Sequence, residues 1–350
     1  MARIGIIGTG WGSRVQVPAF RKAGLEVVAL AGRNPEKTRG IASDLELKAF
    51  DTAESLIDEA EIDLVSIVSP PATHRPLAIR ALERGLHVLC EKPTALNAAE
   101  ARAMRDAAAK KPDRIAIIDH ELRFLPSWRE AKNRIAELGT IRYVEMRYSS
   151  PSRNDPERAW NWWSDREQNG GIWGAVGSHY VDAIRWLAGE IDAVQAVFET
   201  FIGERPTGDG ERRRVTSDDF AAVHLRLSSG ALAAMTFSVV AAVDEDTGLT
   251  IVGENGAFRL AQDRLFHAKV KGEWSEIVPS EGLDIPGDSP GGSFGSGTIW
   301  LGRALRAALD EGDAKAIIEA ATFEDGLRQQ QVLDAAHLSH ANGGRWERTT

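Results

Sequence analysis

Glycines near the start of this 350-residue chain are spaced for binding a phosphate group. They follow Arg3–Ile7, a short and mostly apolar run typical of a strand buried on both faces. A strand that enters a glycine-rich turn and then a helix points backbone N–H groups at a pyrophosphate. Gly8 permits the tight turn, Gly10 lets the backbone approach the phosphates, and small Ser13 replaces the third glycine of G-x-G-x-x-G. We therefore predict that a dinucleotide contacts the turn residues Gly8, Thr9, Gly10, Trp11 and Gly12.

The residues after the second predicted strand, Glu26–Ala31, bear on which dinucleotide binds. An Asp or Glu about 20 residues beyond the glycines accepts hydrogen bonds from the ribose 2′-hydroxyl of NAD. Here Arg33 and Asn34 stand in that place, and an arginine can hold a 2′-phosphate through two hydrogen bonds. We predict that both residues contact the cofactor and that NADP is preferred to NAD. The alternative is an ordinary turn arginine that faces solvent.

A tryptophan-rich segment in the middle of the chain is typical of carbohydrate binding. It runs Trp160-Asn161-Trp162-Trp163, with Asp165 close behind. Indole rings cover the C–H faces of a sugar, while amides and carboxylates take up its hydroxyl groups. We predict substrate contacts for Trp162, Trp163 and Asp165. The alternative is that these tryptophans lie in the core or at an oligomer contact.

Residues 1–121 alternate between predicted strands and predicted helices, which indicates a doubly wound parallel sheet with right-handed crossovers. The predicted strands are Arg3–Ile7, Glu26–Ala31, Leu64–Val68, His87–Cys90 and Ile115–Ile118. Ligands bind such sheets at the carboxyl ends of the strands. Glu121 and Arg123 follow the last strand, so we predict that they reach the substrate.

From residue 122 to residue 350 the pattern changes to one of antiparallel strands interleaved with helices. Val223–Leu227 and Ala257–Leu260 alternate apolar and polar residues, and Ser228–Gly230 and Glu254–Gly256 are predicted turns. We predict a large, mostly antiparallel open sheet with one wet face, in an α+β domain. The chain is thus α/β with two domains, 1–121 and 122–350.

The formal net charge of −9 argues against nucleic-acid binding, which needs a basic face. The basic run Arg212–Arg214 lies among acidic residues and is interpreted as a solvated loop. Cys90 is the single cysteine, which fits a reducing cytoplasm. We find no apolar stretch long enough for a bilayer, no signal-peptide pattern and no metal-ligand spacing. We therefore expect a cytoplasmic protein without a metal, a nucleic acid or a membrane as partner.

Two further motifs, together with the glycine turn, resemble the Gfo/Idh/MocA oxidoreductase family over nearly the whole chain. They are Glu91-Lys92-Pro93 after a strand and Gly177-Ser-His179-Tyr-Val-Asp182. The resemblance implies an N-terminal Rossmann domain and a C-terminal domain whose open sheet often serves in oligomerisation, here as a homodimer or homotetramer. It also implies hydride transfer between a nicotinamide cofactor and a hydroxyl-bearing carbon of a sugar, anhydrosugar or cyclic polyol.

The resemblance also assigns roles to individual residues. It places Lys92 beside the nicotinamide and substrate, with a bond before Pro93 that is often cis, and it makes His179 the proton acceptor. A histidine titrates near neutrality, and an ammonium group stabilises a developing alkoxide. Glu91 would help to position the nicotinamide. The predicted cofactor contacts also include Ser69, Pro70 and His74.

One residue departs from the family pattern, which commonly has an aspartate four residues before the histidine. Here that residue is Ala175. Asp182, one helical turn after His179, is an alternative orienting partner. The departure leaves two other functions open. One is a redox-neutral sugar-processing enzyme that retains its nucleotide, and the other is a non-catalytic NAD(P)-binding regulator.

Overall fold

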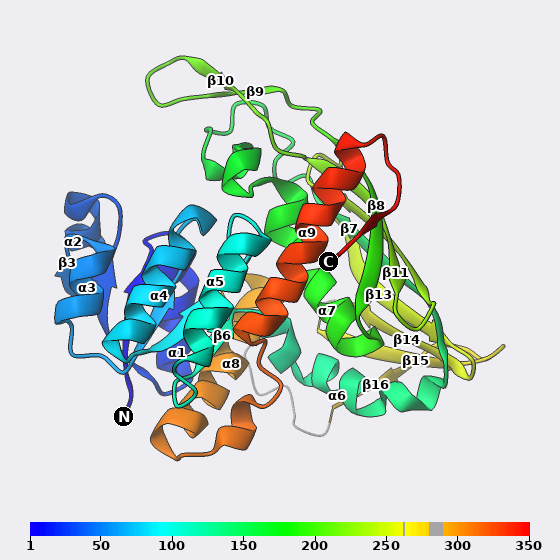
Figure 1. Cartoon of the computed structure of the whole chain (residues 1–350), viewed down its shortest axis with the longest axis horizontal. Helices are drawn as coiled ribbons and strands as arrows, with labels where there is room; N and C mark the ends of the chain where they lie inside the picture. The colour runs from blue at the N-terminus through cyan, green and yellow to red at the C-terminus, as the bar shows by residue number, and fades with distance from the viewer. Residues whose placement is uncertain (262, 280–289) are drawn as a thin grey trace. The chain divides into compact units, whose positions relative to one another are not determined.

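The computed structural model describes residues 1–261, 263–279 and 290–350 (Figure 1). The chain forms two compact units. One comprises Met1–Leu125 and Leu283–Leu327, and the other comprises Pro126–Gly282 and Arg328–Thr350. In the described part of the chain, no helix has the length and apolar character needed to span a membrane.

The first unit is a parallel sheet with helices. Its strands are β1 (Arg3–Ile7), β2 (Glu26–Ala31), β3 (Lys48–Phe50), β4 (Leu64–Ile67), β5 (His87–Cys90) and β6 (Ala116–Ile118). Its helices are α1 (Val17–Lys22), α2 (Pro35–Asp44), α3 (Ala53–Glu59), α4 (His74–Arg84), α5 (Ala98–Ala109) and α8 (Gly292–Asp310). The strand order is β3-β2-β1-β4-β5-β6, and each neighbouring pair is parallel. This confirms the predicted doubly wound sheet; the short edge strand β3 was not predicted.

Two apolar cores in this unit separate the helices into two sets. Leu56 of α3, Leu82 of α4 and Met104 of α5 belong to one core, and Phe20 of α1 and Leu305 of α8 belong to the other. Successive strand residues point to opposite faces of a sheet, so the same short apolar strands supply side chains to both cores. Because the side chains on both faces of the strands fill the two cores, the polar residues that could bind a ligand lie in the loops at the carboxyl ends of the strands.

The helix α8 shows why the two units do not follow a single boundary at residue 121/122. A β-carbon added to Gly302 in α8 would lie 2.8 Å from the Ala23 β-carbon and 3.1 Å from Phe20. The helix therefore packs closely against α1 in the first unit, although the sequence interpretation assigned it to the second domain. The difference arises because chain order does not reveal that a distant helix returns to cover the sheet.

The second unit is built on a large mixed sheet. Its strands are β7 (Ile141–Ser149), β8 (Ile191–Glu199), β9 (Glu204–Pro206), β10 (Arg212–Arg214), β11 (Phe220–Leu227), β12 (Leu232–Ser238), β13 (Glu245–Gly253), β14 (Gly256–Ala261), β15 (Arg264–Lys269), β16 (Ser275–Ile277) and β17 (Glu347–Arg348). Its helices are α6 (Pro126–Arg134), α7 (Ser178–Ala188) and α9 (Phe323–Ala341), the first turn of which belongs to the first unit. Within the described residues the nine-stranded sheet has the order β16-β15-β14-β13-β7-β12-β11-β8-β17. There β7 and β12 pair in parallel, and the other neighbouring strands pair antiparallel.

The alternation predicted for this sheet is observed. Burial alternates along β11 and β12, which form an antiparallel hairpin that turns at Gly230, φ +90°. The sheet thus has one buried face and one exposed face, as predicted. The interpretation of Arg212–Arg214 as a loop is wrong, because these residues form β10 and pair with β9 in a two-stranded ribbon. All three are exposed, so a local polar pattern did not reveal the pairing.

Candidate active site

The glycine turn has the geometry that its sequence predicts. Gly8 has φ +138°, and a β-carbon on it would lie 2.3 Å from the Val68 carbonyl oxygen. At Gly10 an added β-carbon meets nothing within 4 Å, so the backbone there is open to a ligand. Ser13, in the place of the third glycine, donates from Oγ to the Thr9 carbonyl at 2.9 Å and so closes the turn on itself. The residues present therefore fit a bound pyrophosphate.

Neighbouring segments hold the side chains of this turn. A β-carbon on Gly32 would lie 2.6 Å from the Thr9 methyl group, and one on Gly291 would lie 2.6 Å from the Trp11 ring. A β-carbon on Gly12 would lie 2.8 Å from Ile6. Thr9 and Trp11 thus pack against glycines that are distant in sequence, which fixes the shape of the turn.

Gln16 connects the turn to the ends of three strands. It is the last residue of a π-helical turn, Gly12–Gln16, and is fully buried. Its Nε2 donates to Glu91 Oε1 at 3.1 Å and to Asp119 Oδ2 at 2.8 Å, and its Oε1 accepts from Ser66 Oγ at 2.6 Å. Sequence reasoning missed Gln16 and Ser66, because their partners are 50 to 103 residues away.

Glu91 and Asp119 form a buried acidic pair under this glutamine. Burial raises the pKa of Asp119 well above its usual range, and the carboxylates of Glu121 and Glu91 raise it further. Burial also raises the pKa of Glu91, while the Lys92 charge and the Lys92 backbone N–H act in the opposite direction. Burial therefore favours the protonated form of both carboxyl groups, and more strongly for Asp119 than for Glu91.

Lys92 is the second residue after β5 and is half-buried. Its backbone N–H donates to Glu91 Oε2 at 3.3 Å, and the Lys92–Pro93 peptide bond is cis, as the resemblance implies. Only β4 separates β5 from β1 in the sheet. The side chain of Lys92 therefore starts from the same carboxyl edge as the glycine turn.

The residues predicted after β4 are held together by His74. This histidine is buried; its Nε2 lies 2.7 Å from the Ser69 carbonyl oxygen and its Nδ1 lies 3.1 Å from that of Pro93. Ser69 Oγ shares a hydrogen bond of 2.5 Å with Thr73 Oγ1, and Pro70 is half-buried. Burial lowers the pKa of His74. His74 therefore links the loop after β4 to the loop after β5.

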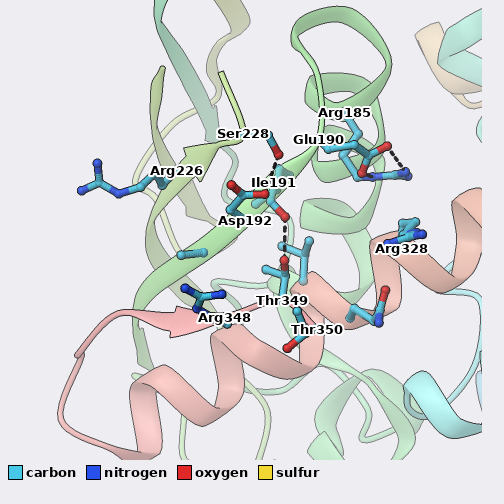
Figure 2. A pocket seen from close by; sticks show the side chains of 13 residues that line it. Arg185, Glu190, Ile191, Asp192, Arg226, Ser228, Arg328, Arg348, Thr349 and Thr350 are labelled. Atoms are coloured by element: carbon cyan, nitrogen blue, oxygen red, sulfur yellow. Dashed lines mark hydrogen bonds and ion pairs between the residues drawn. The ribbon is translucent and has the colours of Figure 1, made fainter. Parts of the chain in front are cut away.

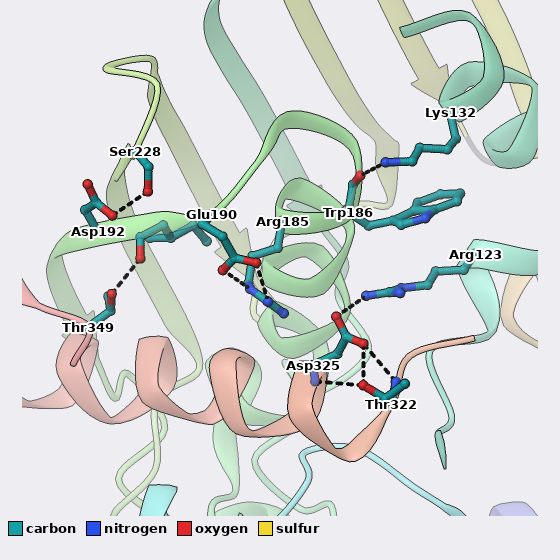
Figure 3. Close-up of polar contacts among 11 residues, drawn as sticks. Arg123, Lys132, Arg185, Trp186, Glu190, Asp192, Ser228, Thr322, Asp325 and Thr349 are labelled. Carbon is teal, nitrogen blue, oxygen red and sulfur yellow. Dashed lines mark hydrogen bonds and ion pairs between the residues drawn. The ribbon is translucent and has the colours of Figure 1, made fainter. Parts of the chain in front are cut away.

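Glu121 and Arg123 lie in a buried 3-10 turn after β6. The guanidinium of Arg123 donates to Asp325 Oδ1 at 3.3 Å (Figure 3). It also donates to the Glu319 carbonyl at 3.2 Å. Asp325 in turn accepts from the backbone and hydroxyl of Thr322. These contacts give Arg123 a role in holding the start of α9 in the first unit.

The loop after β2 presents the positive charge of Arg33 to a possible ligand. Asn34 caps α2 by accepting from the Lys37 backbone N–H at 3.0 Å. Arg33 is exposed, and within the described residues its guanidinium forms no hydrogen bond or ion pair. An arginine in this state can take up a phosphate without first giving up a protein partner.

In the second unit, His179 is the second residue of α7 and is buried. A π-helical turn, Trp173–Gly177, leads into this helix and contains Ala175. The Trp173 and Tyr180 rings both pack on Phe237 of β12, with centroid distances of 6.0 and 5.9 Å. The aromatic contacts on either side of His179 thus fix the start of α7 on the sheet.

Asp218 fixes the segment that precedes this turn. Its Oδ2 accepts from the Trp173 backbone N–H at 2.8 Å, and its carbonyl accepts from Ile172 at 3.0 Å. A β-carbon on Gly171, which has φ +93°, would lie 2.3 Å from Asp218 Oδ1. Burial raises the pKa of Asp218 to about 7. Sequence reasoning missed this residue, because its partners are 45 residues away.

Replacement of Asp218 by asparagine is expected to flatten the pH dependence of stability. Because the pKa of Asp218 is about 7 in the folded chain, against an ordinary value of 3.8, the folded chain binds this proton more tightly than the unfolded chain. Its contribution to the free energy of unfolding therefore falls as the pH rises through that interval, by at most roughly 4 kcal/mol. Urea unfolding at pH 5 and at pH 8 measures the difference.

The neighbouring Asp219 provides the control for this experiment. Both of its carboxylate oxygens accept backbone N–H groups, from Phe201 and Ile202, at 2.9 Å. We expect Asp219→Asn to lower stability at both pH values. An Asp218→Asn variant with the same pH dependence as the wild type would contradict the assignment.

The predicted carbohydrate-binding residues lie in two short 3-10 turns, Trp162–Ser164 and Arg166–Gln168. Trp162 and Trp163 are half-buried. Asp165 caps the second turn, accepting from the Glu167 backbone N–H at 3.1 Å and from Gln168 Nε2 at 2.8 Å. Asp165 thus shapes the segment rather than presenting a free carboxylate.

A cavity of about 570 Å³ lies at the sheet edge formed by β8 and β17, beside α9 (Figure 2). Arg185 on its wall is held by Glu190, at 3.0 and 2.7 Å. The described residues that line the cavity include none of the predicted site residues. We therefore do not assign the reaction to it.

Comparison with known proteins accounts for the geometry of both units. Residues 2–119 match the oxidoreductase family with an NAD-binding Rossmann fold, and residues 128–259 match the GFO/IDH/MocA C-terminal domain. The chain belongs to the Gfo/Idh/MocA oxidoreductase family. This confirms the resemblance, the fold class and the identification as an NAD-binding oxidoreductase.

Relatives of this Gfo/Idh/MocA protein match over most of its length. An uncharacterized oxidoreductase from Synechocystis sp. is 31% identical over 298 residues, which cover 81% of this chain and 80% of the relative. The human glucose-fructose oxidoreductase domain-containing protein 2 is 29% identical, with coverage of 98% and 92%.

Solved structures of similar fold cover the whole chain. An oxidoreductase domain protein from Kribbella flavida has a TM-score of 0.85 at 28% identity, and each chain is covered in full. A levoglucosan dehydrogenase in complex with NADH and L-sorbose has a TM-score of 0.86 at 24% identity, with coverage of 100% and 99%. At this identity the second likeness shows the fold alone.

Proposed function

We propose that the protein is a dehydrogenase that oxidises a hydroxyl-bearing carbon of a sugar, anhydrosugar or cyclic polyol. The observation that carries the proposal is Lys92, which begins at the carboxyl edge of the sheet where the glycine turn is built for a dinucleotide. The similarly folded levoglucosan dehydrogenase, seen with NADH and levoglucosan, supports a sugar as the substrate class.

The proposed mechanism divides the chemistry between two residues. A bound nicotinamide cofactor supplies the hydride acceptor. Lys92 stabilises the oxygen anion that develops as the carbinol carbon loses its hydride, and His179 accepts the hydroxyl proton. Glu91 accepts a hydrogen bond from Gln16 and precedes Lys92, whose charge lowers the Glu91 pKa against the effect of burial.

The proposed preference for NADP rests on Arg33. Replacement of Arg33 by alanine is expected to weaken NADP⁺ binding by roughly 10- to 100-fold and NAD⁺ binding by less than about threefold, because only NADP⁺ carries the 2′-phosphate. Calorimetric titration of both cofactors measures the two constants. Arg39, which pairs with Asp51 at 2.6 Å, is the matched control on α2, and Arg39→Ala should leave the ratio unchanged. An equal loss for both cofactors in Arg33→Ala would contradict the assignment and leave NAD as the cofactor.

We further propose a cytoplasmic homo-oligomer. The outer face of the large sheet exposes Tyr143 of β7, Leu232 of β12 and Val197 of β8, each more than two-fifths exposed. Large apolar side chains on an otherwise polar sheet face favour association with a second copy. Cys90 is buried, in keeping with a reducing compartment. Light scattering of the purified chain tests the assembly, and a monomer at micromolar concentration would contradict it.

The experiment that tests the function is cofactor reduction, followed by nicotinamide absorbance. The purified chain is mixed with NADP⁺ or NAD⁺ and a panel of aldoses, inositols, sugar acids and anhydrosugars. We expect reduction with at least one member of the panel, and loss of this activity in Lys92→Ala and in His179→Ala. Tight cofactor binding without reduction across the panel would contradict the dehydrogenase. It would favour a redox-neutral enzyme or a non-catalytic regulator, for which Ala175 in place of the family aspartate already gives a reason.

A further inference from the structure

The loop after β7 holds Arg153 on a rigid backbone. The Arg153 N–H donates to the Val239 carbonyl at 2.9 Å, just beyond the end of β12. Arg205, itself buried, donates from its guanidinium to the carbonyl oxygens of Arg153 and Asp155, both at 2.7 Å. The position from which the Arg153 side chain starts is therefore fixed before any ligand arrives.

The Arg153 side chain is buried, and no carboxylate of the described residues pairs with it. The residue is 9% exposed, and its guanidinium carbon lies 3.9 Å from the centroid of the Trp163 ring. Within the described residues its guanidinium forms no hydrogen bond or ion pair, and the charged groups that act on it are the cations Arg158 and Arg205. Burial is the main cause that lowers the pKa of Arg153 to about 9, so the group is still charged at pH 7.

Two other buried arginines of the chain have the acidic partner that Arg153 lacks among the described residues. Arg123 is paired with Asp325, and Arg185 is paired with Glu190 (Figure 3). Arg153, 9% exposed, is buried like these two, which are 5% and 7% exposed, and a charge removed from water normally has a counter-charge. Arg213 has the same stacked geometry on Trp160, at 3.9 Å, but it is exposed to water. Arg153 alone of these four combines burial with the lack of an acidic or aqueous partner.

Arg153 and His179 are tied to the same end of the same strand. The carbonyl bonded by Arg153 belongs to Val239, two residues beyond Phe237. Phe237 is the residue on which Tyr180, next to His179, packs. The backbone of Arg153 and the start of α7 are therefore both held at the carboxyl end of β12.

We propose that Arg153, supported on the face of Trp163, binds a carboxylate of the substrate, so that the sugar is a sugar acid. The guanidinium presents N–H groups in a planar fork that matches a carboxylate in two parallel hydrogen bonds, while the indole covers one face of the cation. The carboxylate supplies the negative charge that the described residues do not. This inference rests on the proposed function for the identity of the sugar as substrate, but binding of the acid can be measured without the redox reaction.

The test is calorimetric titration of the full chain, saturated with its reduced cofactor, which cannot accept a hydride from the sugar. The probes are D-glucuronate, its uncharged counterpart D-glucose, and D-glucose 6-phosphate. We expect glucuronate to bind at least about 10-fold more tightly than glucose, and Arg153→Met to remove this preference through a loss of roughly 10- to 100-fold. Arg213→Met, the matched stacked arginine, should change the affinity by less than about twofold. Arg153→Lys keeps the charge without the fork and should keep part of the preference, which guards against a methionine variant that does not fold.

The remaining outcomes either overturn the proposed carboxylate site or distinguish its failure from a failure of the proposed dehydrogenase. Equal binding of glucuronate and glucose, or an unchanged preference in both Arg153 variants, would overturn it. Tighter binding of glucose 6-phosphate than of glucuronate would overturn the carboxylate assignment. Cofactor reduction by neutral sugars alone would refute the inference and leave the dehydrogenase standing. Arg153-dependent binding of glucuronate without reduction of the cofactor by any sugar would support the site and refute the dehydrogenase.

Discussion

Replacement of Lys92 by alanine is expected to lower kcat at least about 1,000-fold on the sugar that reduces the cofactor. The ammonium is proposed to stabilise the developing oxygen anion, and no other side chain of the Glu91-Lys92-Pro93 motif carries a positive charge. The Lys92 charge also lowers the pKa of buried Glu91 and Asp119, so the free energy of unfolding is measured in parallel to separate lost stability from lost chemistry. Steady-state kinetics together with urea unfolding measure both quantities.

Two comparisons make the Lys92 result specific. Lys110→Ala, at the exposed end of α5, removes the same side chain from the same unit and should leave kcat unchanged. Cofactor affinity measured by titration should change less than about fivefold in Lys92→Ala, because the phosphates are bound by the glycine turn. A kcat within about threefold of the wild type would exclude Lys92 from the chemistry.

The second large effect is expected at Gly8, where alanine should destabilise the first unit by more than about 3 kcal/mol. An alanine there must adopt φ +138° and place its β-carbon 2.3 Å from the Val68 carbonyl oxygen. The carbonyl belongs to the backbone next to β4, so it cannot move aside without breaking the Val68 N–H bond to Ile7. Urea unfolding without cofactor measures this loss.

Gly10→Ala is the matched control, two residues further along the same turn. An added β-carbon meets nothing within 4 Å at Gly10, so the stability of the cofactor-free chain should change by less than about 0.5 kcal/mol. Cofactor affinity should nevertheless fall by roughly 10-fold or more, because the methyl group occupies the space that a phosphate needs. If Gly8→Ala were as stable as the wild type, or Gly10→Ala bound the cofactor normally, the assigned roles of the two glycines would be wrong.

The sequence by itself determined the local elements and their order. Short apolar strands between helices predicted β1, β2, β4, β5 and β6 and their parallel arrangement, because burial on both faces requires continuous apolar residues. The glycine spacing predicted a turn that only glycine can form at position 8. The motifs around Lys92 and His179 identified the family, which the matches to both halves of the chain confirmed. The roles of these two residues, like the preference for NADP, stay predictions.

Only the tertiary structure decided which residues meet across long stretches of chain. In the folded chain α8 belongs to the first unit, and Gln16 donates hydrogen bonds to Glu91 and Asp119. Arg123 pairs with Asp325, which is 202 residues away in the sequence. It also left Arg153 buried on Trp163 without a counter-charge. Periodicity reports which face of an element is buried, but not against what, so polar partners that meet only after folding leave no local pattern in the sequence.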